Sequence, residues 1–314
     1  MGFEGLLGNE QLKNNLRASV GRGRASHFYL ITGPEGSGKH TLAQLLAAAL
    51  VCRESDKPCL SCNACRKVLS QNHPDVITVV DPTHKEVPVD MVRQIREDMF
   101  IKPNEADKKV YLFPQALRVE GQNALLKVLE EPPSYCVIMI LSENPEALLP
   151  TIRSRCTQLR LNGLQDAPLR QELQRRHPET DPQAIAAAAA RSGGYLGQAE
   201  SLLEQAETSA QTESFAASFQ KRDPMLLAQT LVPMEKWKRD QLIPELENWI
   251  RLLHEAILCR SGSPSVSATA GALAACRSSQ ELMNAVQALK KCVEYASGNV
   301  SVAAICGHLL WALR

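Results

Sequence analysis

A glycine-rich stretch near the beginning of the chain has the spacing of a phosphate-binding loop. Gly33, Gly38 and Lys39 fit the first seven positions of the pattern G-x-x-x-x-G-K-[ST]. In this pattern, backbone N–H groups surround a phosphate at a helix N-terminus, and the lysine reaches the terminal phosphates. We therefore expect a nucleotide site made by Gly33, Gly36, Gly38, Lys39, His40 and Thr41.

The eighth position departs from the pattern, because His40 stands where a hydroxyl would bind Mg²⁺. Thr41 does not simply replace it, since one residue along a helix turns a side chain by about 100°. Neutral imidazole is also a poor Mg²⁺ ligand compared with oxygen. We expect weak binding of ATP or ADP and no hydrolysis. The alternative is a glycine turn followed by a surface lysine.

Four of the ten cysteines are clustered shortly after this loop. Cys59, Cys62 and Cys65 are separated by two residues each, and Cys52 precedes them. Thiolates with this spacing can converge on one tetrahedral metal ion, so we expect a structural zinc site. Four protein ligands leave no open position for a substrate, which disfavours catalysis by the metal. An iron–sulfur cluster and unligated thiols are the alternatives, although the further Cys-Pro of an iron–sulfur run is missing.

Short apolar segments alternate with helical patterns over the first half of the chain, and these elements must position the candidate residues. Helical spacing predicts helices at 8–20, from the loop to residue 50, at 89–100 and at 121–131. Apolar runs predict strands at 27–32, 76–80, 108–113 and 136–141. This alternation predicts an open, mostly parallel α/β sheet with helices covering both faces.

The end of the third predicted strand lacks the acids of a nucleotide hydrolase. Such enzymes place an Asp for Mg²⁺ there, usually with a Glu that orients the attacking water. Here the strand ends in Pro114 and Gln115, and neither residue can do either task. Glu130 and Glu131 end a predicted helix ahead of two prolines, where a solvated helix terminus is the simpler interpretation.

After residue 163 only helical patterns continue. Helices are predicted at 182–191 and 197–206, followed from about Ser209 by longer, leucine-rich ones. A connection at 261–265 precedes the final pair. We predict a small helical domain followed by a larger one.

Length and composition narrow the functional classes. A chain of 314 residues is long enough for two or three domains. Its formal net charge of +1 argues against a dedicated polyanion binder. No apolar run approaches the roughly 18 residues of a membrane span, and the N-terminal residues lack the pattern of a secretory signal. We expect a cytoplasmic protein with no membrane partner.

Taken together, these stretches resemble the bacterial clamp-loader subunits of the AAA+ class. The resemblance rests on residues 27–39, the four-cysteine insertion, the run 123–133 and the run 151–156, and it weakens after about residue 205. It implies a RecA-like AAA+ domain at 1–162 with a zinc module at about 50–70. It further implies a helical lid at 163–207 and an all-α collar at 208–314 that closes a five-subunit ring.

The resemblance also implies a non-hydrolysing, stator-type role in the DNA polymerase III clamp loader. Motor subunits carry Asp-Glu at the positions of Pro114 and Gln115, and Thr at the position of His40. They carry a sensor arginine near Leu196 and Gly197. ATPase and nucleotidyltransferase activities would then reside in other subunits.

The motif Ser154-Arg155-Cys156 implies that Arg155 acts in trans as an arginine finger on the adjacent subunit's nucleotide. A planar, permanently charged guanidinium suits the charge that develops on a transferring phosphoryl group. The implied partners are gamma/tau-type motor subunits and a delta-type subunit, with the sliding clamp and primer-template DNA reached through the complex. An exposed arginine in a surface ion pair is the alternative for Arg155.

Two other functions remain open from the residues alone. A P-loop ATPase or kinase acting alone would need carboxylates near the loop, and Asp81 is the best candidate. A nucleic-acid-reading cysteine module would need a basic surface. Residues 52–70 instead mix Arg53, Lys57, Arg66 and Lys67 with Glu54 and Asp56.

Overall fold

The computed structural model describes residues 2–206, 210–264, 267–298 and 300–313. The chain divides into two compact units. The first comprises Met1–Gln165 and Tyr195–Gln198, and the second comprises Asp166–Gly194 and Ala199–Arg314.

A five-stranded parallel sheet forms the centre of the first unit, in the order β2-β4-β6-β1-β7. Its strands are β1 (Phe28–Thr32), β2 (Val76–Thr78), β4 (Lys109–Phe113), β6 (Cys136–Ser142) and β7 (Thr157–Arg160). Two further short strands, β3 (Glu86–Val87) and β5 (Ala116–Leu117), pair with each other. The predicted parallel α/β sheet is confirmed.

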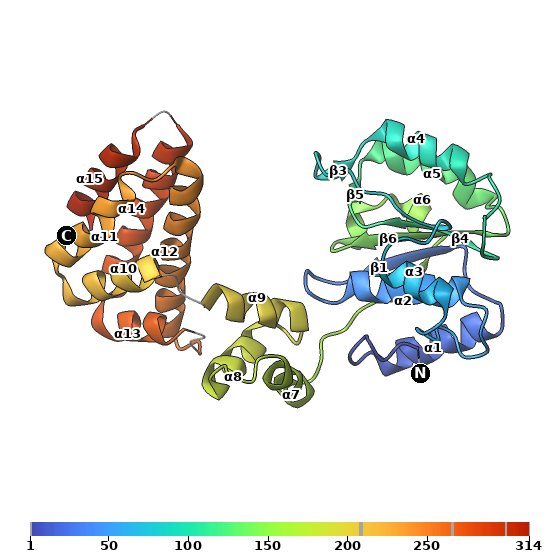
Figure 1. Cartoon of the computed structure of the whole chain (residues 1–314), viewed down its shortest axis with the longest axis horizontal. Helices are drawn as coiled ribbons and strands as arrows, with labels where there is room; N and C mark the ends of the chain where they lie inside the picture. Colours follow the sequence, from blue (N-terminus) through green and yellow to red (C-terminus); the bar gives the residue numbers. More distant parts are fainter. Residues whose placement is uncertain (1, 207–209, 265–266, 299, 314) are drawn as a thin grey trace. The chain divides into compact units, whose positions relative to one another are not determined.

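Helices cover both faces of this sheet (Figure 1). One side carries α1 (Glu10–Gly21), α2 (Lys39–Val51) and α3 (Asn63–Leu69), and the other carries α4 (Val89–Asp98), α5 (Val119–Glu130) and α6 (Pro150–Arg153). A short 3₁₀ helix, η1 (Pro145–Ala147), precedes α6.

Strand residues alternate between two hydrophobic cores. Tyr29 and Ile31 belong to the core that includes α2, whereas Phe28 and Leu30 belong to the core that includes α4 and α5. Every residue of β1 is therefore buried, which explains its continuous apolar run.

The edge strand β7 escaped the sequence prediction. Its sequence is Thr-Gln-Leu-Arg, and only Leu159 is buried. A short edge strand with three exposed positions has no apolar run to indicate it. The prediction also overextended β2, which ends at Thr78 rather than at Val80.

The second unit is helical. Its elements are α7 (Asp166–Arg176), α8 (Pro182–Arg191), α9 (Leu196–Ala206), α10 (Ala210–Lys221), α11 (Pro224–Met234), α12 (Arg239–Arg260), α13 (Ala268–Cys276), α14 (Ser279–Ser297) and α15 (Val302–Ala312). The first residues of α9 belong to the first unit. Among the described residues, no strand follows Arg160.

An aromatic stack lies in the core of the second unit. The rings of Phe215 and Trp249 lie 4.2 Å apart between centroids and are nearly parallel, which joins α10 to α12. Leu169, Leu173 and Ile185 of α7 and α8 are buried outside this larger core. The division into a lid at 163–207 and a collar at 208–314 stays a prediction. The boundary between the predicted lid and the predicted collar lies outside the described residues. Ser265, in the predicted connection at 261–265, also lies outside them.

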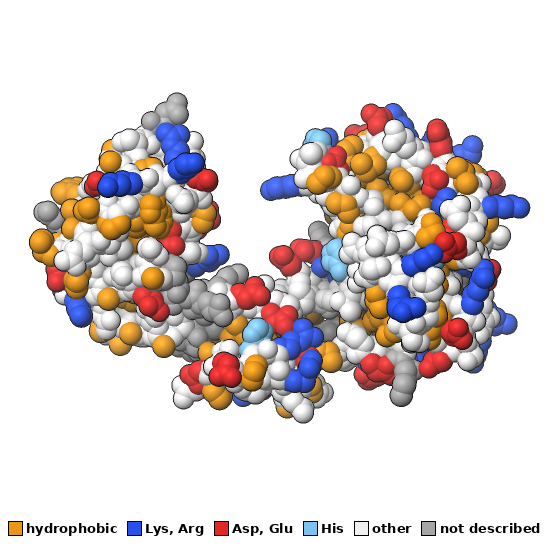
Figure 2. Space-filling view, viewed as in Figure 1, with side chains coloured by type: hydrophobic (Ala, Val, Ile, Leu, Met, Phe, Trp, Pro, Cys, Tyr) orange, Lys and Arg blue, Asp and Glu red, His pale blue; other side chains and the backbone are white. Residues whose placement is uncertain are grey.

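Acidic and basic side chains are interspersed on the visible face of the first unit (Figure 2), in keeping with the formal net charge of +1. None of the described helices is both long and apolar enough to cross a bilayer.

Candidate functional site

The glycine-rich loop connects the central strand β1 to the N-terminus of α2. Gly36 and Gly38 have φ angles of 70° and 89°, in the left-handed region that glycine adopts without steric cost. Gly38 is the N-cap of α2, so Lys39 begins the helix. The sequence pattern thus forms the strand, loop and helix that it predicts, with the loop at the carboxyl edge of a parallel sheet.

Lys39 is engaged by the protein's own acceptors. Its Nζ donates to the carbonyl oxygens of Gly33 at 2.7 Å and Pro34 at 2.8 Å, and lies 3.8 Å from a carboxylate oxygen of Glu143. Only 8% of Lys39 is exposed. Burial lowers the pKa of Lys39, although the negative charges of Glu143 and Glu35 act to raise it. The ammonium group is held within the loop.

The backbone at the start of α9 touches the tip of the loop. The Gly197 N–H donates to the Gly36 carbonyl oxygen at 3.0 Å. A Cβ added to Gly197 would lie 2.7 Å from the Cα of Gly36, and one added to Gly36 would lie 2.4 Å from the Gln198 nitrogen. This close approach requires glycine at both positions.

Ser37 contributes a buried hydroxyl to the loop. Its Oγ has no hydrogen-bond partner among the described residues. Such a group costs free energy when it is left unpaired.

His40 and Thr41 occupy the first turn of α2 and are exposed. Partial burial is the main cause that lowers the pKa of His40, and the positive charge of Lys39 lowers it further. The imidazole is therefore neutral at neutral pH and provides no hydroxyl for a metal ion.

Residues at the end of β4 serve a structural purpose. The Gln115 side chain accepts from the Asp81 N–H at 2.8 Å and donates to the carbonyl oxygens of Asp81 and His84. It therefore joins the end of β4 to the turn after β2.

Asp81 is occupied within that same turn. Its carboxylate accepts from the side chain and the N–H of Thr83 and lies 2.8 Å from His84 Nδ1. The hydrogen bonds from Thr83 are the main cause that lowers the pKa of Asp81 to about 2, and the hydrogen bond with His84 adds to their effect. Asp81 thus holds its own turn together.

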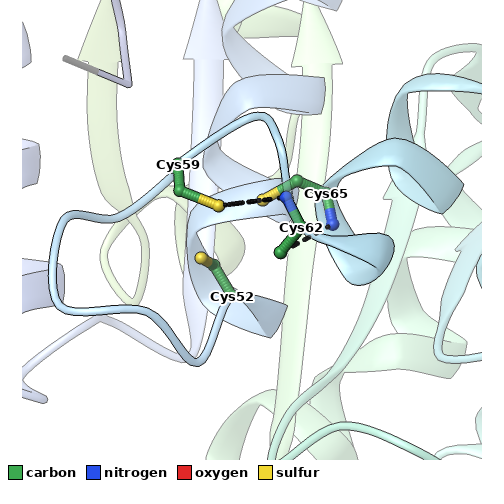
Figure 3. A group of neighbouring side chains, drawn as sticks. All are labelled: Cys52, Cys59, Cys62 and Cys65. Carbon is green, nitrogen blue, oxygen red and sulfur yellow. Dashed lines mark hydrogen bonds between the residues drawn. The ribbon is translucent and has the colours of Figure 1, made fainter.

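The four clustered cysteines converge in space (Figure 3). Cys52 caps the end of α2, Cys59 lies in the following loop, Cys62 caps the start of α3, and Cys65 lies within α3. Their sulfur atoms all lie within 4.8 Å of one another, and those of Cys59 and Cys65 are 3.9 Å apart. Four 2.3 Å bonds to a tetrahedral Zn²⁺ would place the sulfurs about 3.8 Å apart. The cluster can hold one metal ion.

Backbone amides favour thiolates in this cluster. The N–H of Cys62 donates to the Cys59 sulfur at 3.3 Å, and the N–H of Cys65 donates to the Cys62 sulfur at 3.4 Å. The bond from Cys62 lowers the pKa of Cys59 to about 6. Burial instead raises the pKa of Cys65, so this thiol needs a positive neighbour to lose its proton.

Arg155 lies at the surface directly after α6. Its Nη1 donates to the Thr151 carbonyl oxygen at 2.9 Å, and its Nη2 donates to Glu130 Oε1 at 3.2 Å. The side chains of Arg155 and Glu130 are 39% and 54% exposed. An ion pair with this exposure contributes about 0–1 kcal/mol.

The family model described as "DNA polymerase III, delta subunit" matches residues 8–165, about half of the chain. The chain belongs to this family. The matched segment contains the glycine-rich loop, the four cysteines and Arg155.

Curated relatives agree with this assignment. DNA polymerase III subunit delta' of Pseudomonas aeruginosa is 37% identical over 180 residues, covering 55% of each chain. The Bacillus subtilis delta' subunit is 35% identical over 49% of this chain and 48% of its own length. The Bacillus subtilis tau subunit is 34% identical over 49% of this chain and 28% of its own length. The chain therefore matches about half the length of these delta' relatives, and the resemblance to bacterial clamp-loader subunits is confirmed.

Two solved structures illustrate the wider similarity. A gamma subunit-related DNA polymerase III protein from Thermotoga maritima is 17% identical and covers 97% of this chain and 100% of its own, with a TM-score of 0.46. The RuvB Holliday junction branch migration motor of Thermotoga maritima is 19% identical over 63% of this chain and 61% of its own, with a TM-score of 0.44.

The structure also shows side-chain contacts at these residues that the sequence did not indicate. Glu143 reaches Lys39, Glu130 reaches Arg155, and Gln115 bonds to Asp81. Glu143 comes directly after β6, which pairs with β1, so an acid following this strand was the available signal. Nothing in the sequence spacing indicated that Glu130 and Arg155 meet.

Proposed function

We propose that this chain is a stator-type subunit of the DNA polymerase III clamp loader. It does not hydrolyse ATP itself and donates Arg155 to the nucleotide of an adjacent motor subunit. The main support is a contrast between two cations. Lys39 is enclosed by loop carbonyls and Glu143, whereas the side chain of Arg155 is 39% exposed beside Glu130.

The loop lacks the groups that hydrolysis requires. Gln115 and the carboxylate of Asp81 are used by the turn after β2, and His40 offers no hydroxyl. The backbone of Gly197 packs on Gly36 near the position where motor subunits carry a sensor arginine. ATP or ADP would bind weakly at Gly33, Gly36, Gly38, Lys39, His40 and Thr41.

We assign a structural Zn²⁺ to Cys52, Cys59, Cys62 and Cys65. The distances between the sulfurs suit a tetrahedral site, and four protein ligands leave no open position. The metal would fix the loop between α2 and α3.

The proposed assembly extends to the helical unit. A lid at 163–207 and a collar at 208–314 would join gamma/tau-type motor subunits and a delta-type subunit in a five-subunit ring. The ring would load the sliding clamp on primer-template DNA, and this chain would reach both through the complex.

The test is ATP turnover by the reconstituted complex, with clamp and primed DNA present. Arg155→Ala should lower the rate at the adjacent site by ~10³ or more. The total ATP turnover of the complex should fall by at least the fraction that this site contributes. Arg93→Ala removes an exposed arginine paired with Asp90 in α4 and should leave the rate unchanged.

Two results would contradict the proposal. Unchanged ATP turnover in an intact complex containing Arg155→Ala would show that Arg155 does not act as an arginine finger. ATP hydrolysis by the isolated chain, lost in Lys39→Ala, would instead favour a P-loop ATPase acting alone, with Glu143 as the nearby carboxylate.

A further inference from the structure

The guanidinium of Arg155 is held from two elements. The Thr151 carbonyl oxygen, in α6, accepts from Nη1, and Glu130, the last residue of α5, accepts from Nη2. Arg155 follows the C-cap of α6, and its own N–H donates to the Ile152 carbonyl oxygen at 3.1 Å. The backbone and the side chain of Arg155 are therefore both anchored.

The position of Glu130 is unusual for a carboxylate. Helix carbonyls make the C-terminal end of a helix electronegative, so an acid in the last turn is unfavourable there. Glu130 ends α5 and faces the cation of Arg155, which compensates for this placement. Glu131 follows as the exposed C-cap, so the two neighbouring acids have different surroundings.

The two bonds leave most of the guanidinium available. Arginine has five N–H donors, and the contacts with Thr151 and Glu130 use one donor on each terminal nitrogen. The remaining donors and the exposed part of the side chain can meet a phosphate. An arginine without such anchors would lose much more rotamer freedom when it engages a phosphate.

We propose that Glu130 is a positioning residue for Arg155. Its carboxylate restricts the guanidinium to the orientation in which its free donors face outward, before the neighbouring nucleotide is engaged. This inference rests on the proposed function, because it assumes that Arg155 acts in trans.

The experiment measures ATP turnover by the reconstituted complex containing Glu130→Ala. Loss of pre-organisation should lower the rate at the adjacent site by about three- to tenfold. Glu130→Gln keeps an acceptor oxygen and should lower the turnover rate less than Glu130→Ala does. Glu131→Ala changes the neighbouring exposed acid and should leave the rate unchanged.

A double-mutant cycle separates positioning from a general structural effect. In the Arg155→Ala background, Glu130→Ala should cause no further loss, because no guanidinium remains to be positioned. The thermal unfolding midpoint of Glu130→Ala should match that of Glu131→Ala. An additive loss in the double variant would overturn the inference.

The outcomes also distinguish this inference from the function on which it rests. If Arg155→Ala lowers turnover while Glu130→Ala equals the unaltered chain, only the role of Glu130 fails. If Glu130→Ala raises turnover, the carboxylate competes with the phosphate, and the positioning role is again wrong. If Arg155→Ala has no effect, the finger itself fails.

Discussion

Asp75 shows how one buried charge can hold two distant segments together. It is fully buried, and its carboxylate accepts from the N–H groups of Asn104, Glu105 and Ala106 at 2.6–2.8 Å. Burial alone would raise the pKa of Asp75, but these three bonds outweigh it and the pKa is lowered. The ionised carboxylate therefore attaches the segment before β2 to the loop before β4.

We expect Asp75→Asn to destabilise the first unit by about 1.5–3 kcal/mol at pH 7, because hydrogen bonds to a charged acceptor are replaced by weaker ones. Urea unfolding measures the change. Asp107→Asn alters an acid whose side chain is 82% exposed and should change stability by less than about 0.5 kcal/mol. Equal effects of the two substitutions would contradict this account.

The same residue predicts a pH dependence. Because the folded-state pKa of Asp75 is depressed, its stabilisation is complete above the unfolded value of about 4. It is lost as the pH falls through the lower folded-state value. The stability difference between the unaltered chain and Asp75→Asn should shrink below pH ~4.

At the scale of elements, sequence periodicity predicted most of the helices and strands whose side chains face a core, but it missed α7, in which Leu169 and Leu173 are buried. The bounds of α8 agree with the prediction, and α9 begins one residue earlier than expected. The strand β7 and the helix α3 were missed because each is short and presents several exposed residues.

The candidate site was predictable only where chemistry follows from spacing along the chain. The loop at 33–39 and the four cysteines are local patterns, and each forms a compact arrangement. The contacts of Lys39 with Glu143 and of Arg155 with Glu130 join residues from different elements. Such pairs depend on how helices and strands pack, which no local pattern specifies.

The cysteine module should depend on its metal. Purified chain should carry about one zinc ion, and Cys59→Ser should lose it because a ligand thiolate is removed. Hydrogen exchange at residues 52–65 should then rise while the central sheet stays protected. Metal analysis by mass spectrometry measures the zinc content.

Cys276→Ser provides the control, since Cys276 is an exposed cysteine in α13. This variant should retain zinc. Full zinc content in Cys59→Ser would show that the cluster does not hold the metal.

At the scale of the whole molecule, family membership is established on the first unit. The family match ends at residue 165, and the helical unit follows it. Two tryptophans of that unit differ sharply in exposure. Trp249 is fully buried, whereas Trp311 on α15 is 71% exposed.

We expect Trp311→Ala to weaken entry of the chain into the complex by roughly thirtyfold, if the proposed collar buries this side chain as an interface anchor. Its own unfolding should change by less than about 0.5 kcal/mol. Analytical ultracentrifugation with the motor and delta-type subunits measures assembly.

Trp249→Ala is the contrasting variant and should destabilise the chain by about 3–5 kcal/mol, because it leaves a cavity beside Phe215. Unaltered assembly of Trp311→Ala would show that this part of α15 lies outside any subunit contact.

The contact between Gly36 and Gly197 has a consequence for engineering this loop. Grafting an arginine at residue 197 would first introduce a Cβ only 2.7 Å from the Gly36 Cα, and overpacking of this kind costs typically about 1–3 kcal/mol. The main chain of α9 would have to retreat before any longer side chain could point toward a bound triphosphate. An arginine introduced at residue 197 alone would therefore meet a steric barrier, and a working sensor there would also require changes in the backbone of the loop or of α9.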